Sequence, residues 1–300
     1  GRSYTETAAE SRSQHKSQGF GSSERRGRLT NALVLLEGDA VKADPFEGID
    51  TTWRRVTGGE RVGRLLAEAE KAFDPRDPAA VVPRLLEAHA ALRALPADPW
   101  VEVKRKEILA VVRSASGLWL EAMAASPSAT PGSAFRLNVA ALVRAGSGAT
   151  LARVTVPWGA GEGLPAGAGL KLNEPVQGGT SVPVPADAEV TQPHWLRARP
   201  GKGLYAVLAP KDAIRPDGAA LRVSFDVVMG GETLAYDVPV LFRRTDPVKG
   251  EEVRPFVVEP PVTVDLEEQV LVLPDDRPRV VRAIVRAADA PADRTGPPPL

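Results

Sequence analysis

Side chains that could do chemistry are scarce in this sequence, and the most suggestive group lies near its start. The chain holds three histidines and no cysteine, and the first histidine, His15, lies in the polar stretch of residues 8–20. Ser3 is followed three residues later by Glu6, a capping box that predicts the start of a helix, and Gly19 is the residue type at which helices commonly end. We therefore expect His15 on the last helical turn, where the helix dipole stabilises its protonated form and a substrate can reach it.

The ordinary interpretation of this histidine is a solvated surface residue between Arg12 and Lys16. A resemblance over the surrounding residues favours a different interpretation of His15. The string A-A-E-S-R-S-Q-H-K-S-Q, residues 8–18, resembles the C-terminal motif of PIG-L/LmbE-type metal-dependent N-deacetylases. Later strings resemble, in the same order, the long multidomain bacterial members of that family: D-P-F-E-G-I-D-T-T-W (44–53), Q-P-H-W-L (192–196), D-P-V-K-G-E (246–251) and R-P-F-V-V-E-P-P-V-T-V (254–264).

This resemblance implies a reaction, namely hydrolysis of an N-acetyl group on an amino sugar or its conjugate. A divalent metal, usually zinc, would activate water and polarise the carbonyl group. His15 would be a catalytic residue that donates a hydrogen bond to the developing oxyanion, and Arg12, Lys16 and Gln18 would orient substrate hydroxyl groups. The resemblance further implies an exported protein, periplasmic or extracellular, of which this chain is the C-terminal portion.

No metal ligands are assigned within the chain. A catalytic zinc site needs about three protein ligands held close together, and His15, His89 and His194 are far apart in the sequence. The family that the chain resembles holds its metal on an H-P-D-D-type and an H-x-D-H-type motif, and the sequence contains neither. We therefore expect the zinc ligands upstream of Gly1, and we interpret His89 as a packing or surface residue.

Composition limits the classes of partner. Lysine and arginine number 38, as do aspartate and glutamate, and a chain without net charge is not expected to act mainly on nucleic acid. No run of 18 apolar residues occurs, so no transmembrane segment is expected. The absence of cysteine excludes disulfides and thiolate metal sites within this stretch. The 27 glycines and 28 prolines are typical of turn-rich β modules.

The first part of the chain predicts an α+β multidomain protein that begins with the C-terminal end of an α/β deacetylase-like catalytic domain, residues 1–57. Within it, the apolar run 29–36 predicts a strand or a buried turn. Residues 58–126 predict an antiparallel helical segment, because apolar side chains recur with helical spacing. Its three helices are expected at 61–73, 78–95 and 100–124.

The second part predicts β structure. Residues 127–133 are interpreted as a linker, and residues 134–246 as an immunoglobulin-like β-sandwich of about seven short strands. Strand candidates, found from alternation with period two, are 135–141, 150–158, 170–172, 180–184, 204–208, 221–229 and 233–242. Gly230 and Gly231 join the last two into a hairpin. Residues 159–169 predict a flexible loop, and residues 253–300 the start of a second β-sandwich, with strands at 256–258, 262–266, 270–273 and 279–287.

A different class of function stays open. The β-sandwiches can be non-catalytic modules that bind a glycan or a protein partner. His194 and Trp195, with Tyr205, would then form an aromatic platform for sugar rings, or they brace a turn between sheets. The oligomeric state and the identity of the amino-sugar or glycoconjugate substrate are not determined by these residues.

Overall fold

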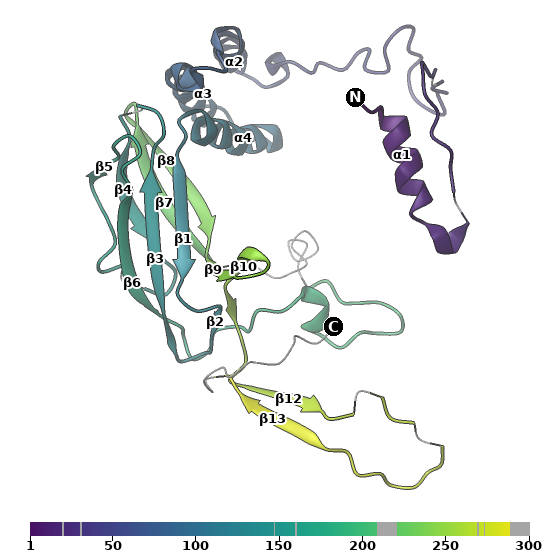
Figure 1. The fold of residues 1–300 in the computed structure, drawn as a ribbon. Helices are drawn as coiled ribbons and strands as arrows, with labels where there is room; N and C mark the ends of the chain where they lie inside the picture. The colour runs from purple at the N-terminus through teal and green to yellow at the C-terminus, as the bar shows by residue number, and fades with distance from the viewer. Residues whose placement is uncertain are drawn as a thin grey trace. The chain divides into compact units, whose positions relative to one another are not determined.

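The computed structural model describes residues 1–19, 21–30, 32–146, 148–159, 161–208, 221–268, 270–272 and 274–288. These residues form two compact units, Gly1–Asp50 and Thr51–Leu300. The second unit combines helices with sheets of mostly antiparallel strands (Figure 1). The coarse prediction of an α+β protein is confirmed.

The first unit contains α1 (Tyr4–Ser13) and a short 3-10 helix, η1 (Lys16–Gln18). Both halves of the predicted capping box are present, because the Ser3 hydroxyl accepts from the Glu6 N–H while the Glu6 carboxylate accepts from the Ser3 N–H. Gly19 has the left-handed conformation expected of a helix stop, with φ at 68°, but it ends η1.

The prediction that His15 lies on the last turn of this helix is wrong. α1 ends at Ser13, and His15 is the N-cap residue of η1. The Ser13 hydroxyl donates to the Ala9 carbonyl and also contacts both backbone polar groups of Ser22. Such side-chain bonds offer the backbone an alternative to continued helix, so the chain turns before His15.

The apolar run at 29–36 does not form the predicted strand or buried turn. Its described residues have no regular structure, and Leu33, Val34 and Leu36 are exposed by 81%, 79% and 94%. The only buried residue among the described residues of the first unit is Ala9. The described residues of the run are therefore not part of a buried core within their own unit.

The second unit begins with η2 (Trp53–Arg55) and continues with four helical elements, α2 (Glu60–Ala72), η3 (Pro78–Val81), α3 (Val82–Arg93) and α4 (Pro99–Ala115). Each α-helix buries one apolar stripe. The Asp98 carboxylate caps α4 by accepting from the N–H groups of Trp100 and Val101. Pro99 occupies the first turn, where a missing N–H costs nothing. The predicted helices are confirmed, apart from the end of the third.

The third helix was predicted to run to residue 124, and it ends nine residues earlier. Gly117 adopts a left-handed conformation with φ at 58°, and the chain then enters β1 (Trp119–Ala124), which pairs with β3 (Ala134–Leu142). Alternate side chains of β1 are buried. The apolar residues at 118, 120, 122 and 124 fit the period of a strand. Pairing with β3 decides between helix and strand for this segment.

Nine strands form two sheets (Figure 1). The five-stranded sheet has the order β10-β9-β1-β3-β6, in which only β1 and β9 run parallel. The four-stranded sheet has the order β5-β4-β7-β8 and is antiparallel throughout. The remaining bounds are β4 (Thr150–Thr155), β5 (Ala168–Gly169), β6 (Val176–Pro183), β7 (Arg222–Met229), β8 (Glu232–Pro239), β9 (Leu241–Asp246) and β10 (Gly250–Pro255).

One hydrophobic core joins the helices to both sheets. Alternate residues of β3, β7 and β8 point into it, and Leu137, Phe225 and Leu234 are fully buried. The predicted hairpin between β7 and β8 is confirmed, with positive φ at both Gly230 and Gly231. Buried residues of α2, α3 and α4 belong to the same cluster. The helices are therefore part of this unit's core, which the predicted boundary at 126 did not anticipate.

The predicted linker at 127–133 contains a strand, β2 (Ser128–Ala129), which pairs in parallel with β11 (Val257–Val258). Phe256 is buried and stacks on Phe135 with ring centroids 4.1 Å apart. Residues 253–258, which we predicted to open a second sandwich, thus belong to the first core. The contacts responsible lie about 120 residues apart in the sequence, so local pattern could not reveal them.

Of the predicted second sandwich, the described residues show one hairpin, β12 (Val262–Leu266) with β13 (Ala283–Ala287). Residues 270–272 form no strand, and residue 273 lies outside the described residues. The candidate strand at 204–208 is wrong, because these residues have no regular structure and Leu204 is 77% exposed. The predicted loop at 159–169 includes β5 at its end. It also packs against β6, since the Gly179 N–H donates to the Gly163 carbonyl at 3.3 Å.

Candidate functional site

The four residues of the predicted catalytic and substrate-binding group are all exposed in the first unit: Arg12, His15, Lys16 and Gln18. They lie at the end of α1 and in η1, so they share one short stretch of backbone. Within the described residues, their side chains make no hydrogen bond or ion pair. The structure therefore places the four side chains together on a surface, where none of them is buried.

The described part of the chain does not fit a zinc ion. His15, His89 and His194 lie on η1's N-cap, α3 and η4 (His194–Leu196). No group of three or more histidine, aspartate or glutamate side chains in that part is arranged to hold a metal. No step of a reaction is therefore derived through a metal bound by these residues.

The other two histidines have structural partners. His89 is buried, as the packing interpretation requires, and its Nδ1 lies 3.6 Å from Oε2 of Glu232. His194 and Trp195 contact each other edge to face, with centroids 5.2 Å apart. Tyr205 is 61% exposed. These contacts do not assemble three rings into the predicted aromatic platform.

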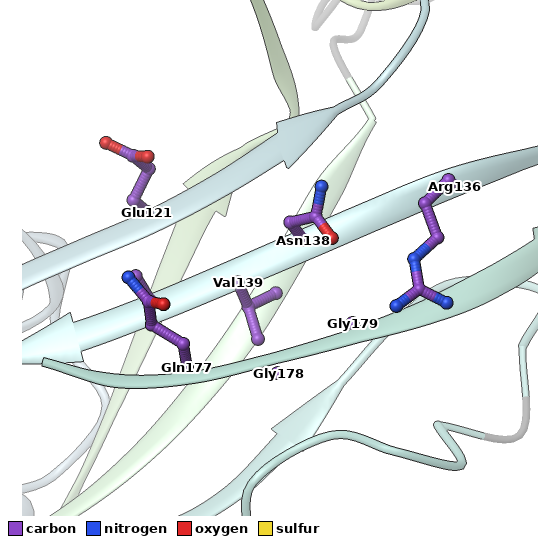
Figure 2. Close-up of a pocket in the computed structure, with 8 residues that line it drawn as sticks. Glu121, Arg136, Asn138, Val139, Gln177, Gly178 and Gly179 are labelled. Atoms are coloured by element: carbon purple, nitrogen blue, oxygen red, sulfur yellow. The ribbon is translucent and has the colours of Figure 1, made fainter.

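A shallow groove of about 400 Å³ lies on the exposed face of the five-stranded sheet (Figure 2). β1 contributes Glu121, β3 contributes Arg136 and Asn138, and β6 contributes Gln177. Strand pairing brings them together, because Ala140 is the partner of both Glu121 and Gln177, and Asn138 pairs with Gly179. Four polar side chains from three strands thus stand on one strip of the sheet.

Two glycines of β6 shape the groove. A methyl group on Gly179 would lie 2.7 Å from Nη2 of Arg136 and 2.7 Å from Oδ1 of Asn138. These two polar groups therefore lie directly over the Gly179 backbone, which forms the floor. A methyl group on Gly178 would instead lie 2.6 Å from Cδ of Pro165 and 2.7 Å from the Gly163 carbonyl oxygen. Gly178 thus allows the 161–167 loop to pack against the same strand.

The charges of the groove differ in their partners. Arg243 of β9 donates to Oε2 of Glu121 at 2.7 Å, and its Nε lies 3.7 Å from Glu251. Hydrogen bonding to Glu121, aided by the attraction of both carboxylates, raises the pKa of Arg243. No ion pair joins Arg136 to any carboxylate in the part of the chain that the structure describes.

This arrangement can bind a polar ligand. Arg136 offers only donors, Glu121 offers acceptors, and the amides of Asn138 and Gln177 offer both. Trp119 precedes Glu121 by two residues, so it lies on the same face of β1, where it is 47% exposed. Alternation in the sequence identified residues 135–141 only as a strand and gave no role to Arg136 or Asn138. The Gly178–Gly179 pair, in which Gly179 lies opposite Asn138 of β3, is the signal that could have marked the groove.

A second concavity, of about 450 Å³, lies between the helices and β8. His89, Arg93 and Arg105 line it, together with Thr233. Arg93 donates to Oε2 of Glu232 at 3.1 Å. Arg93 therefore joins α3 to the β7–β8 hairpin, whereas Arg105 pairs with Glu102 on its own helix at 3.0 Å.

Comparisons of this chain with protein-family models, with curated proteins and with solved structures gave no match. Among the described residues, no helix is both long and apolar enough to cross a membrane.

Proposed function

We propose that this chain is the C-terminal part of a PIG-L-like N-deacetylase and that its second unit is an accessory module that binds the sugar polymer. The resemblance of residues 8–18, and of the ordered strings after them, supports the enzyme family. The groove on the five-stranded sheet supports the binding role, and it is the observation on which this proposal depends.

The second unit, in this proposal, is an immunoglobulin-like β-sandwich. Consecutive strands change between the two large sheets four times, from β3 to β4, from β5 to β6, from β6 to β7 and from β8 to β9. The strands β1, β3 and β6 stand in one sheet, and β4, β7 and β8 in the other. Such alternation between two mostly antiparallel sheets is typical of Greek-key sandwiches. Binding surfaces on this architecture are carried by the sheet faces and loops, while the core holds them rigid.

A carbohydrate fits the groove for chemical reasons. Sugar hydroxyl and acetamido groups both donate and accept hydrogen bonds, which matches the mixture of Glu121, Asn138 and Gln177 side chains. Trp119 adds an apolar aromatic surface beside them, of the kind on which sugar rings pack. A shallow open strip suits a polymer that extends past the site in both directions.

In the full-length enzyme, under the same proposal, zinc is held by residues upstream of Gly1 and the protein acts outside the cytoplasm on an amino sugar or glycoconjugate. His15 would donate a hydrogen bond at the reacting centre, with Arg12, Lys16 and Gln18 nearby. Because these four residues are exposed in their own unit, their role requires the catalytic domain to supply the rest of the pocket.

The binding role is tested by isothermal titration of the 300-residue chain with a hexamer of N-acetylglucosamine. The double variant Asn138→Ala, Gln177→Ala should weaken binding about tenfold or more, because each lost hydrogen bond contributes about 0.5–1.5 kcal/mol. Thr155→Ala, an exposed polar residue of β4 on the other sheet, is the matched control and should bind as the wild type does. Unchanged affinity of the double variant would assign any binding to another surface.

A further inference from the structure

The groove carries one charge that nothing in the described chain neutralises. Glu121 is balanced by Arg243 at 2.7 Å, and Asn138 and Gln177 are neutral. Arg136 is exposed and has no carboxylate partner within the described residues. The strip on which a ligand would lie therefore carries a net positive charge, although the whole chain has none.

The neighbours of Arg136 leave its charge available. Its partner on β6 is Ser181, which is neutral. Its Nη2 lies over Gly179, where a side chain would collide with it, and Oδ1 of Asn138 lies over the same glycine. A guanidinium is a planar fork of donors that matches a carboxylate in a two-point contact, and such charge-assisted bonds are about twice as strong as neutral ones.

We propose that the groove selects an acidic sugar, a hexuronate unit whose carboxylate is bound by Arg136 while its ring hydroxyls contact Asn138 and Gln177. The inference rests on the proposed function and specifies the class of polymer. It also separates the roles of the two arginines, because Arg243 neutralises Glu121 whereas Arg136 contacts the ligand. Gly179 then determines access, since any side chain at this position would displace Arg136 and Asn138.

The test compares three hexasaccharides by isothermal titration with the 300-residue chain. The first alternates N-acetylglucosamine with glucuronate, the second is the same compound with its carboxyl groups reduced to alcohols, and the third is the N-acetylglucosamine hexamer. The first should bind about ten- to a hundredfold more tightly than the reduced compound, as expected for a hydrogen bond to a charged group. This preference should shrink as salt rises from about 0.05 to about 0.5 M, because salt screens exposed charges.

Two variants locate the effect. Arg136→Gln should remove the preference for the acidic compound and leave the affinity for the reduced one nearly unchanged. Arg136→Lys should retain part of the preference for the acidic compound, since an ammonium group keeps the charge and loses the planar fork. Arg64→Gln is the matched control, because Arg64 is exposed on α2 and has no ion pair among the described residues. The control should behave as the wild type does.

The outcomes separate the two claims. Equal affinity for all three sugars would overturn the selection of an acidic unit and leave the proposed glycan binding standing. A preference that persists in Arg136→Gln would overturn the role of Arg136. Failure of every sugar to bind would overturn the proposed function as well. Binding of a glutamate hexapeptide as tight as that of the acidic sugar would show that the site recognises an acidic protein segment instead.

Discussion

The two units of this chain are stabilised in different ways. Gly1–Asp50 buries only Ala9 among its described residues, and its contacts are hydrogen bonds and exposed ion pairs such as Arg2 with Glu10 and Arg26 with Glu24. Thr51–Leu300 buries a continuous apolar core shared by three helices and two sheets. Exposed ion pairs contribute little to stability, whereas buried apolar area is the dominant favourable contribution. The candidate binding groove lies on the unit with the core, and the predicted catalytic histidine lies on the unit without one.

Amide hydrogen exchange should show the largest difference between the units. The amides of β7 are expected to exchange only through global unfolding, with an opening free energy approaching the about 5–15 kcal/mol typical of a domain. The amides of α1 should open at close to zero cost, because almost no apolar contact would be broken. Exchange of the 300-residue chain, followed by mass spectrometry of peptides, measures both. Similar protection in α1 and β7 would contradict the comparison.

A matched pair of truncations tests the same difference energetically. Phe225 is fully buried in β7, so Phe225→Ala should lower the free energy of unfolding by about 3–5 kcal/mol through lost transfer energy and a cavity. Leu36 is 94% exposed in the first unit, and Leu36→Ala should change the free energy of unfolding by less than about 0.5 kcal/mol. Urea titration followed by tryptophan fluorescence measures both. A large cost at Leu36 would mean that the apolar run packs against a surface of this chain.

The smallest expected effect concerns pH and the buried histidine of the second unit. Burial lowers the pKa of His89, while Glu232 opposes this shift and Arg93 and Arg105 reinforce it. The unfolded chain therefore binds a proton more readily than the folded one. The contribution of neutral His89 to the stability of the fold is fully present above the unfolded pKa of about 6.5. It is lost as the pH falls through the lower pKa of the folded state.

The variant His89→Gln should accordingly lose less stability than the wild type between about pH 7 and about pH 5, because Gln does not titrate. Glu232→Gln should lose more, since it removes the carboxylate that favours the protonated histidine. Thermal melts at a series of pH values measure both. Parallel pH curves for the wild type and His89→Gln would show that another group is responsible for the pH dependence in this range.

Sequence patterns predicted those elements whose signals are local. The Ser3–Glu6 capping box and the Gly230–Gly231 turn were both found, because their partners lie within a few residues. The strand β3 was found from alternation alone. The third predicted helix ran too far, since residues 119–124 contain apolar side chains that fit either period. Only pairing with β3 and β9 shows that they form β1.

The candidate groove was not predictable in the same way. Glu121, Asn138 and Gln177 come from three strands, and each is an ordinary polar residue in its own segment. Their proximity depends on strand order and register, which are set by core residues on the opposite faces of the same strands. A shift of one residue in any pair would turn these side chains into the core. No single segment of the sequence contains that information.

The sequence by itself therefore determined the helix starts, the turns and the buried face of most elements, because these depend on contacts within a turn or on a period of two or 3.6 residues. Tertiary structure decided where the chain changes from helix to strand at Gly117, why Phe256 belongs to the first core, and which polar side chains meet beside Gly179. The physical reason is that these outcomes depend on packing between segments that lie far apart in the sequence, by 139 residues in the contact of Arg93 with Glu232. Such contacts form only when the whole core of the second unit is assembled.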